Sequence, residues 1–368
     1  MFYYKEYKIM VCYVLDQNFN RTTVLDHYES LIWVDRFWEP GEFEIYLPAG
    51  DELFTFLAAG NYLIQKNSEH VMIMEGIKID TDVEDGNKVT VTGRSIESIL
   101  DRRIIAKQTD FNDKNLQEAT QQLLNENIIS PSIPARKISN FIFEASTDTK
   151  ITSLKLTAQY TGDNLLDVIV DICKSNKIGF KITLNDSNQF VFKLYAGTDR
   201  SYEQSTEDYV VFSPKFDNFN NSNYEEDEKP FKNITLVAGE GEGTDRKTLW
   251  VGNGSGLNRK ELYTDARDLQ KKDEEGQEIS DAEYNAKLHQ RGLEKLSECE
   301  KTEKFDGETD PFESFVYDRD YTMGDIVQLR NEYGFEAPSR ITEFIFSENT
   351  QDGLNYYPTF EVVQDEEE

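Results

Sequence analysis

Apolar and polar residues alternate in short runs through the first hundred residues, and each run stops at turn-forming residues. One run covers residues 43–47 and ends at Pro48. Two others, residues 77–79 and 89–91, flank the sequence Glu84-Asp85-Gly86-Asn87. An Asp-Gly pair between two alternating runs is a strong hairpin signal. Because successive side chains of a strand point to opposite faces of a sheet, the pattern predicts antiparallel strands with one buried face.

Tyrosine and phenylalanine, which favour strands, number 19 and 23, and together with the alternation they indicate a mainly β chain. We expect residues 1–105 to form a small antiparallel β-barrel-like domain. Two short helices are predicted within it, near Asp51–Ala59 and near Ser95–Asp101. At 368 residues the whole chain is too long for one ordinary core, and we expect roughly two to four packed units.

Residues 106–205 change from alternating strands to helical spacing, which predicts an α+β insertion domain. Apolar residues recur at the spacing of a helix from Leu116 to Ile128, with Asp113 as the expected N-cap. The first element of this domain is therefore predicted to be an amphipathic helix.

A second helix and a hairpin are predicted in the remainder of this domain. Asp163 is the expected N-cap of the helix, and Gly179 is expected to mark its end. Residues 180–184 and 190–194 then alternate on either side of the turn 185–188, so we expect them to pair as antiparallel strands.

Residues 206–268 and 300–368 return to strand patterns and are predicted to form a second β-barrel-like domain. The expected strands are Val210–Phe212, Ile234–Ala238, Thr248–Val251, Ile326–Leu329, Ile341–Ile345 and Phe360–Val363. The polar, acidic stretch Phe216–Pro230 is expected to be an exposed loop. Between the two parts lie a charged loop and a helix, residues 269–299. In this segment Ser280-Asp281-Ala282-Glu283 has the spacing of a capping box, which predicts where the helix begins.

The charge of the chain argues against nucleic acid as a specifically bound partner. Lysine and arginine number 39, aspartate and glutamate number 70, and the formal net charge is −31. A surface of this kind repels phosphate groups, so DNA or RNA binding is disfavoured. Acidity also keeps a protein soluble, and this simpler explanation has as much support as a functional one.

The cysteines and the N-terminal sequence indicate a protein made in the cytoplasm. Cys12, Cys173 and Cys299 lie far apart and lack CxxC spacing, which argues against a disulfide framework or a zinc site. The first residues contain no long apolar stretch, so neither a signal peptide nor a membrane anchor is expected.

Residues that commonly carry catalysis do not form a recognisable constellation. His27, His70 and His289 never fall in HExxH, HxH or HxxxH spacing, so each is predicted to be a surface or packing residue. The nucleophile motif GxSxG is absent. We therefore predict no catalytic, cofactor-binding or metal-binding residues, no cofactor and no enzymatic activity.

Two short motifs resemble ligand sites but are explained better as turns. Gly239-Glu240-Gly241-Glu242-Gly243 lacks the Lys-Ser/Thr of a phosphate-binding loop, and its glutamates repel phosphate. Residues Asp80–Gly86 resemble the start of a calcium loop, but the glycine falls one place late and the distal glutamate is missing. We expect a flexible connection and a hairpin turn respectively, with calcium binding as the alternative for the second motif.

Several short stretches along the chain resemble one known family and occur in the order found there. They are Phe37–Pro48, Val89–Ser95, Ile99–Ile105, Asn164–Asp167, Ile178–Phe180, Gly239–Arg246, Arg259–Leu262, Asp265–Leu269 and Tyr321–Val327. On these stretches the chain resembles the tail-hub proteins (baseplate hub or tail-tip adaptor) of siphophages that infect Gram-positive bacteria. That family is similar in fold to the central hub of contractile tails.

The resemblance implies a structural protein that works as a homotrimer. Its two barrel domains per chain would form a pseudo-sixfold ring, which joins the sixfold tail tube and the distal tail protein to a threefold tip. The expected partners also include the tape measure protein and a tip protein that binds the receptor or acts as a tail lysin. DNA would pass through the ring without specific binding, and acids lining the channel would keep its phosphates from sticking. The expected location is the tail tip of the virion, after assembly in the cytoplasm of the bacterial host.

Two alternative functions remain open at this stage: a tail-associated cell-wall hydrolase, and a carbohydrate-binding module that recognises the host. The second would use exposed aromatic residues such as Trp33, Trp38 or Trp250, although burial in the core is the expected position of all three.

Arg94, Arg102 and Arg103 lie beside the short helix predicted near residues 95–101. Arginines at such positions usually form ion pairs on the surface of their own chain, and this is our expectation here. In a strongly acidic assembly they would instead pair with carboxylates of a neighbouring subunit, which is the alternative.

Overall fold

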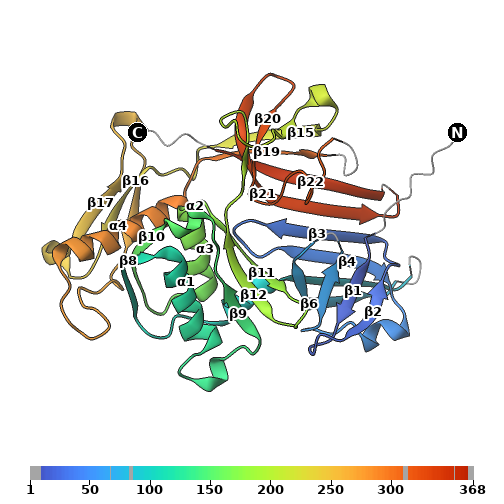
Figure 1. Cartoon of the computed structure of the whole chain (residues 1–368), viewed down its shortest axis with the longest axis horizontal. Helices are drawn as coiled ribbons and strands as arrows, with labels where there is room; N and C mark the ends of the chain where they lie inside the picture. The colour runs from blue at the N-terminus through green and yellow to red at the C-terminus, as the bar shows by residue number, and fades with distance from the viewer. Residues whose placement is uncertain (1–9, 67, 83–85, 310–313, 352, 364–368) are drawn as a thin grey trace.

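The structure is a computed structural model that describes residues 10–66, 68–82, 86–309, 314–351 and 353–363. It is mainly β, as predicted, and contains several sheets. Figure 1 shows that the strands of the two chain ends lie side by side, although they are far apart in the sequence. No helix within the described ranges is long and apolar enough to cross a membrane.

One large sheet joins the two ends of the chain. Its strands are β1 (Cys12–Leu15), β2 (Arg21–Leu25), β3 (Ser30–Arg36), β4 (Glu42–Pro48), β5 (Tyr62–Gln65), β6 (Val71–Asp80), β7 (Lys88–Ser95), β13 (Asp199–Arg200), β14 (Val211–Phe212), β15 (Asn220–Asp227), β19 (Thr302–Glu308), β20 (Ile326–Arg330), β21 (Glu336–Asn349) and β22 (Gly353–Val362). The order is β15-β19-β22-β21-β3-β4-β7-β6-β5-β1-β2, and β20 links β13 and β14 to β21. The antiparallel pair β21–β3 connects the C-terminal strands to the N-terminal strands.

Strand β4 shows why the first hundred residues form a sheet. Phe43, Ile45 and Leu47 are buried, whereas Glu42 and Glu44 are exposed, as the alternation of apolar and polar residues predicts. The two short helices predicted in this region are present as single 3₁₀ segments, η1 (Asp51–Thr55) and η2 (Ile96–Arg102). The division into two barrels remains a prediction.

The central part of the chain is an α+β unit. It contains β8 (Thr109–Asn115), α1 (Leu116–Leu124), η3 (Asn125–Ile129), η4 (Pro134–Arg136), β9 (Phe141–Glu144), α2 (Thr149–Thr152), β10 (Lys155–Tyr160), α3 (Leu165–Ser175), β11 (Gly179–Leu184) and β12 (Phe190–Tyr195). Strands β8 and β10 pair with each other, and β9, β12 and β11 form a second small sheet. The predicted hairpin is confirmed, because Phe180 pairs with Leu194 and Ile182 with Phe192.

Both predicted N-caps in this unit are wrong. Helix α1 is capped by Asn115, whose side chain accepts hydrogen bonds from two backbone amides, and Asp113 instead pairs with Lys155. Helix α3 is capped by Asn164, while the carboxylate of Asp163 accepts a hydrogen bond from Thr161 N. In each case the asparagine directly precedes the first helical residue, which is the position that a capping side chain requires.

The predicted end of α3 at Gly179 is also wrong, because the helix ends at Ser175 and Gly179 begins β11. A side-chain Cβ at position 179 would lie 2.4 Å from the ring of Phe37. Glycine is therefore needed here because β11 packs closely against Phe37, in the turn between β3 and β4. It does not mark the end of a helix.

The third part of the chain is a small sheet covered by one helix. The sheet has the order β17-β16-β18, with β16 (Ile234–Ala238), β17 (Thr248–Gly252) and β18 (Glu261–Asp265), and α4 (Asp281–Ser297) packs on one of its faces (Figure 1). The predicted start of the helix is confirmed, since Ser280 Oγ accepts a hydrogen bond from Glu283 N. Single 3₁₀ turns are found at η5 (Pro214–Phe216), η6 (Gly243–Asp245) and η7 (Gly256–Asn258).

The exposed loop expected at Phe216–Pro230 is wrong in its central part, which forms β15 and pairs with β19. This strand is the edge of the large sheet, so most of its side chains face solvent and need not be apolar. Backbone hydrogen bonds to β19 and the packing of one aromatic residue, Tyr224, against Phe305 hold it in place, and a single aromatic residue in a polar stretch does not reveal a strand in the sequence.

Candidate interaction surfaces and buried polar clusters

The three histidines occupy different environments. His27 is exposed and contacts Asp26, and His289 is exposed on α4, so both are surface residues as predicted. His70 is a packing residue, because only 5% of it is exposed.

His70 belongs to a buried polar cluster where β3, η2 and β11 meet. His70 Nδ1 lies 3.2 Å from Oε1 of Glu97, and the same carboxylate oxygen accepts a hydrogen bond of 2.7 Å from Ile182 N. Asp35 is also buried, and its carboxylate accepts hydrogen bonds from Trp33 Nε1 and from a serine hydroxyl. A cavity of about 110 Å³ adjoins the cluster. The cluster connects the N-terminal strands β1–β7 to the α+β unit.

Burial and neighbouring charges shift the pKa values of this cluster in opposite directions. Burial lowers the pKa of His70, but the carboxylates of Asp35 and Glu97 outweigh burial and raise that pKa to about 9. Burial raises the pKa of Asp35, an effect that the charge of His70 only partly reverses. For Glu97 the imidazolium of His70 outweighs burial, and the pKa is lowered. At neutral pH the histidine is therefore a cation held between carboxylates.

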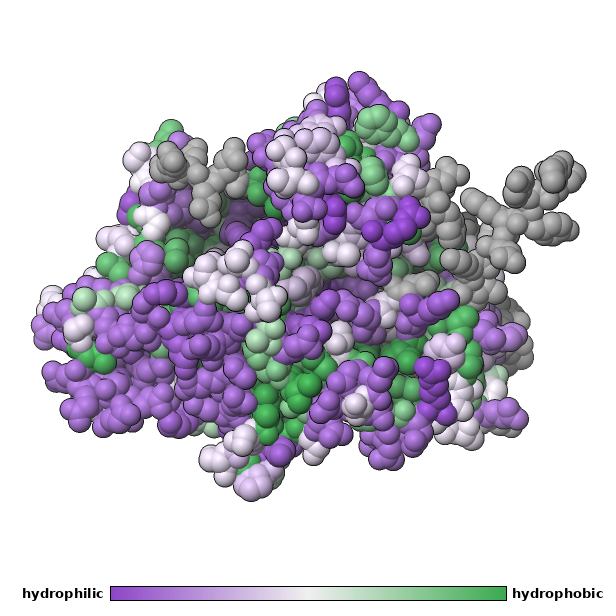
Figure 2. Space-filling view, in the orientation of Figure 1, coloured by the Kyte–Doolittle hydropathy of each residue, from purple (hydrophilic) through white to green (hydrophobic). Residues whose placement is uncertain are grey.

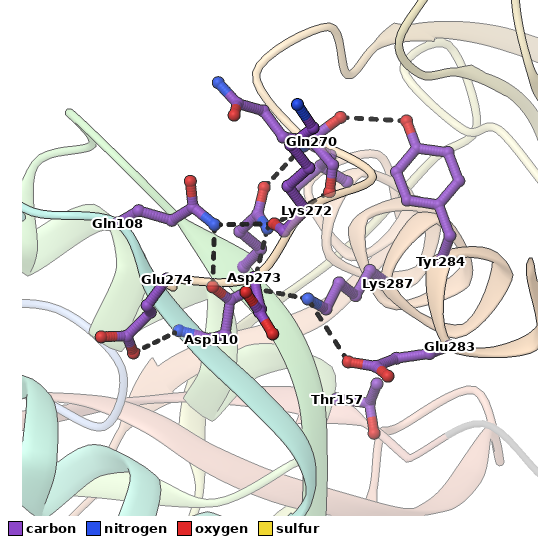
Figure 3. A network of polar contacts seen from close by, with 12 residues as sticks. Gln108, Asp110, Thr157, Gln270, Lys272, Asp273, Glu274, Glu283, Tyr284 and Lys287 are labelled. Atoms are coloured by element: carbon purple, nitrogen blue, oxygen red, sulfur yellow. Dashed lines mark hydrogen bonds and ion pairs between the residues drawn. The ribbon is translucent and has the colours of Figure 1, made fainter. Parts of the chain in front are cut away.

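A second polar network attaches α4 and the preceding loop to β8 (Figure 3). The Lys287 side chain is fully buried, and its ammonium pairs with Asp110 and lies 3.6 Å from a carboxylate oxygen of Glu283. The amide group of Gln108 donates hydrogen bonds to the Asp110 carboxylate and to the backbone oxygen of Lys272. These contacts bind the charged loop and the helix to the α+β unit, which indicates a structural role for the network.

The glycine-rich motif forms a turn between β16 and β17. Gly241 and Gly243 have positive φ angles of 107° and 55°, which favour glycine and fit the predicted connection. The calcium-like motif Asp80–Gly86 lies partly outside the described residues. Within residues 10–66, 68–82, 86–309, 314–351 and 353–363, no group of three or more His, Cys, Asp or Glu side chains is placed to hold a metal ion.

Arg94 forms ion pairs within the same chain, as expected for a surface arginine. Its guanidinium binds Glu75 on β6 through two hydrogen bonds and lies 3.3 Å from Asp101. Arg103 donates hydrogen bonds to the backbone oxygens of Arg102 and Arg136.

The tryptophans differ in burial, and the expectation that all three are core residues is wrong for Trp250. Trp33 is fully buried, and Trp38 is half-buried with its Nε1 donating to Ile178 O. Trp250 is 46% exposed. It lies on the face of the β17-β16-β18 sheet that points away from α4, and no described element covers that face at this position.

Trp250 belongs to a row of large side chains across this sheet. Leu236 on β16 pairs in register with Trp250 on one side and with Tyr263 on the other, so the three share a face. Tyr263 is 58% exposed. The Arg259 guanidinium lies 4.6 Å from the centre of the Trp250 ring, and Arg246 donates a hydrogen bond to the Tyr263 hydroxyl. We call these five residues the aromatic face.

The aromatic face has the composition of a protein contact surface. Exposed tryptophan, tyrosine and arginine are enriched where proteins bind one another. Hydrophilic side chains cover most of the side of the molecule seen in Figure 2, with hydrophobic patches between them. The sequence shows no alternation signal for the face, since Trp250 stands between Leu249 and Val251 and Tyr263 directly follows Leu262.

The fold is similar to those of three solved phage or prophage tail proteins. A tail protein from Neisseria meningitidis has a TM-score of 0.56 and 12% identity, with 96% of both chains covered. The prophage tail protein gp18 from Listeria monocytogenes has a TM-score of 0.53 and 12% identity, with 96% of this chain and 94% of that chain covered. The 43 kDa tail protein of prophage MuSo2 from Shewanella oneidensis has a TM-score of 0.57 and 10% identity, with 96% and 98% covered. At these identities the similarity is one of fold.

A sequence comparison identifies the family. No curated protein matches the sequence. The profile of the family described as "Siphovirus ReqiPepy6 Gp37-like protein", however, matches residues 11–360, which is nearly the whole chain. This chain therefore belongs to the Siphovirus ReqiPepy6 Gp37-like protein family.

Proposed function

We propose that this protein is the structural hub at the tip of a phage tail. Three copies form a ring that joins the sixfold tail tube and the distal tail protein to a threefold tip, and the ring surrounds the channel through which DNA leaves. The protein acts by holding these parts together and not by catalysis.

The observation that carries this proposal is the fold. Three tail proteins from different bacteria share it over at least 94% of both chains, and the family is a siphovirus family. A similarity that extends over the full length supports a common architecture better than a match to one small domain, because the arrangement of all units is retained.

The large sheet offers two surfaces that suit contacts between neighbouring copies. Strands β2 and β15 stand at the two ends of the strand order, and each is paired on one side only within the described residues. A ring needs two different surfaces on each copy, so that the first surface of one copy meets the second surface of the next. Closure of a ring also protects exposed strand edges from aggregation.

The aromatic face is a further contact surface in this proposal, and its occupant is a second copy of the chain. Arg246 and Arg259 flank the aromatic side chains of this face, and their charges are already balanced within the chain by Asp265 and Glu261. The contact between copies therefore rests on the exposed aromatic side chains and not on unpaired charge.

The oligomeric mass of the purified protein tests the proposal. We expect light scattering to give three times the chain mass of 42.6 kDa, and negative-stain images of the same sample to show rings. A protein that stays monomeric alone, and also stays monomeric when mixed with the distal tail protein, would contradict the proposal.

A second candidate function is recognition of a host carbohydrate, favoured by the exposure of Trp250 and Tyr263. Aromatic rings at a surface bind sugars by stacking, but here one face of the Trp250 ring is covered by Arg259. Binding of the isolated protein to cell-wall glycans, lost in Trp250→Ala, would support this second function over the first.

A further inference from the structure

A cleft of about 520 Å³ lies where the three parts of the chain meet. Its walls come from the turn between β3 and β4, the turn after α3, the segment before β16, the C-terminal end of α4, and the ends of β21 and β22. A neighbouring cleft of about 420 Å³ shares Trp38, Lys177 and Lys301 with it, so the two form one continuous depression. Volumes of this size are typical of ligand sites.

The lining of the cleft has the opposite charge to the molecule. Its charged side chains are the four cations Lys177, Lys232, Lys301 and Arg340 and the two carboxylates Glu300 and Glu361. The lining therefore has a net charge of +2, in a chain whose net charge is −31. Burial raises the pKa of the Glu361 carboxyl group.

The cations of the cleft differ in how they are neutralised within the chain. Lys177 pairs with Glu300, and Lys301 pairs with Glu226 and Glu303. Lys232, in contrast, has no ion pair with any residue that the structure describes. Its ammonium is thus a cation beside an open cleft, and neither Glu300 nor Glu361, the two carboxylates that line the cleft among the described residues, pairs with it.

Apolar side chains form the remaining part of the lining. Leu293 and Leu296 from the last turns of α4 line the cleft together with Phe231 and Val362. Leu293 is 39% exposed, an unusual exposure for a large apolar side chain. The cleft therefore combines an apolar wall with cations, which is the composition expected for a ligand that is both apolar and anionic.

We propose that this cleft binds a short acidic peptide segment of a partner chain, with its carboxylates on Lys232 and Lys301 and an apolar side chain on Leu293. Charge complementarity favours this occupant, because carboxylates replace water around an unpaired ammonium. A nucleic acid is disfavoured, since the acidic surface around the cleft repels a long phosphate polymer. The inference goes beyond the proposed function, because the cleft is distinct from the aromatic face and from the sheet edges.

Fluorescence anisotropy with a labelled octapeptide of alternating glutamate and leucine tests the proposal on the full chain. We expect the peptide to bind the wild-type protein and to bind more weakly as salt concentration rises. Lys232→Glu is expected to weaken binding by about tenfold, through loss of one favourable contact and gain of a repulsion. Lys215→Glu changes the net charge equally at an exposed residue outside the cleft lining, and it should bind like the wild type.

A second pair of variants tests the apolar wall. Leu293→Ser is expected to weaken peptide binding severalfold, whereas Leu257→Ser, at a fully exposed leucine outside the cleft, should leave binding unchanged. Thermal melting of each variant checks that the fold is retained. The proposal fails if the wild type does not bind the peptide, if a lysine–leucine peptide binds equally well, or if Lys232→Glu behaves like Lys215→Glu.

Two other occupants would give distinct results. If Lys232→Glu lowers the oligomeric mass while the wild type binds no peptide, the cleft is a contact between copies and the proposal is overturned. If double-stranded DNA binds with the same dependence on Lys232, the ligand is a phosphate polymer and the proposal is again overturned. A wild type that binds the peptide but stays monomeric both alone and with the distal tail protein would contradict the proposed function and leave this inference standing.

Discussion

His70 Nδ1 and Glu97 Oε1 lie 3.2 Å apart in the interior, and through Ile182 N the same glutamate oxygen also holds β11. The pair thus fixes the α+β unit against the N-terminal strands β1–β7. Two carboxylates, those of Glu97 and Asp35, depend on one imidazolium for compensation of their buried charge.

Replacement of the histidine removes that compensation. We expect His70→Gln to lower the free energy of unfolding at pH 7 by about 3 kcal/mol, because it leaves buried carboxylates without a cation. Urea denaturation measures the change. The control is His27→Gln, since the His27 side chain is 93% exposed, and it should unfold like the wild type. Equal stabilities of the two variants would contradict the assigned role of His70.

The same pair predicts a dependence of stability on pH. The pKa of His70 is about 9 in the folded chain and 6.5 ordinarily, so the folded state binds this proton more tightly than the unfolded state. The stabilisation is therefore complete below pH 6.5 and is lost as the pH rises through 9. We expect the stability difference between wild type and His70→Gln to shrink between pH 7 and pH 10, measured by urea denaturation at several pH values. A difference that grows over this range would have the wrong sign.

The carboxyl group of Asp171 on α3 should destabilise the folded chain when it is charged, whereas charged His70 stabilises it. Burial raises its pKa to about 7, since Lys295 at 4.0 Å only partly offsets the desolvation. Ionisation therefore costs stability as the pH rises from the ordinary pKa of 3.8 through 7. We expect Asp171→Asn to raise the free energy of unfolding at pH 8 by about 1–2 kcal/mol and to have little effect at pH 4.

Asp186→Asn provides the control for Asp171→Asn. Asp186 lies exposed in the turn between β11 and β12, so its replacement should change stability equally little at both pH values. Thermal unfolding at pH 4 and pH 8 measures both variants. If Asp171→Asn destabilises the protein at pH 8, the ion pair with Lys295 outweighs the burial of the carboxylate and this account of α3 is wrong.

Local patterns predicted the hairpin β11–β12 in register, because alternation and a polar turn are both encoded within the seventeen consecutive residues Gly179–Tyr195. They did not predict that β3 pairs with β21, about 300 residues later. Strand partners this distant in sequence are chosen by the packing of the whole molecule, and a short window of sequence contains no record of them.

The buried clusters and the aromatic face were missed for different physical reasons. His70 and Glu97 are 27 residues apart and form no recognisable motif, and only the turn of η2 against the sheet brings them together. Trp250 was expected in the core because large aromatic residues are usually buried. The sequence marks it as a strand residue, but it does not show which face of the sheet α4 covers.

Lys287 gives a prediction about how α4 is attached. Its buried ammonium pairs with Asp110 on β8, so Lys287→Met leaves that carboxylate without its cation and should cost about 3 kcal/mol. The double variant Lys287→Met with Asp110→Asn should recover part of this loss, since the uncompensated charge is gone. His289→Met, at an exposed residue of the same helix, is the control. Urea denaturation of the wild type, the single variants Lys287→Met and Asp110→Asn, and the double variant gives the coupling energy, and a value near zero would show that the pair contributes nothing.

The aromatic face yields a test that separates assembly from stability. Trp250 and Tyr263 are about half exposed, and their combined replacement by alanine should change the free energy of unfolding of the single chain by less than about 1 kcal/mol. At a contact between copies, however, truncation of such residues costs about 2 kcal/mol or more each, so rings should dissociate at concentrations at which the wild type stays assembled. Light scattering over a dilution series measures this. Tyr333→Ala, at a 91% exposed tyrosine between β20 and β21, controls for loss of any exposed aromatic residue. If the double variant forms rings as stable as those of the wild type, this face does not join the copies, and a glycan or another tail protein becomes its occupant.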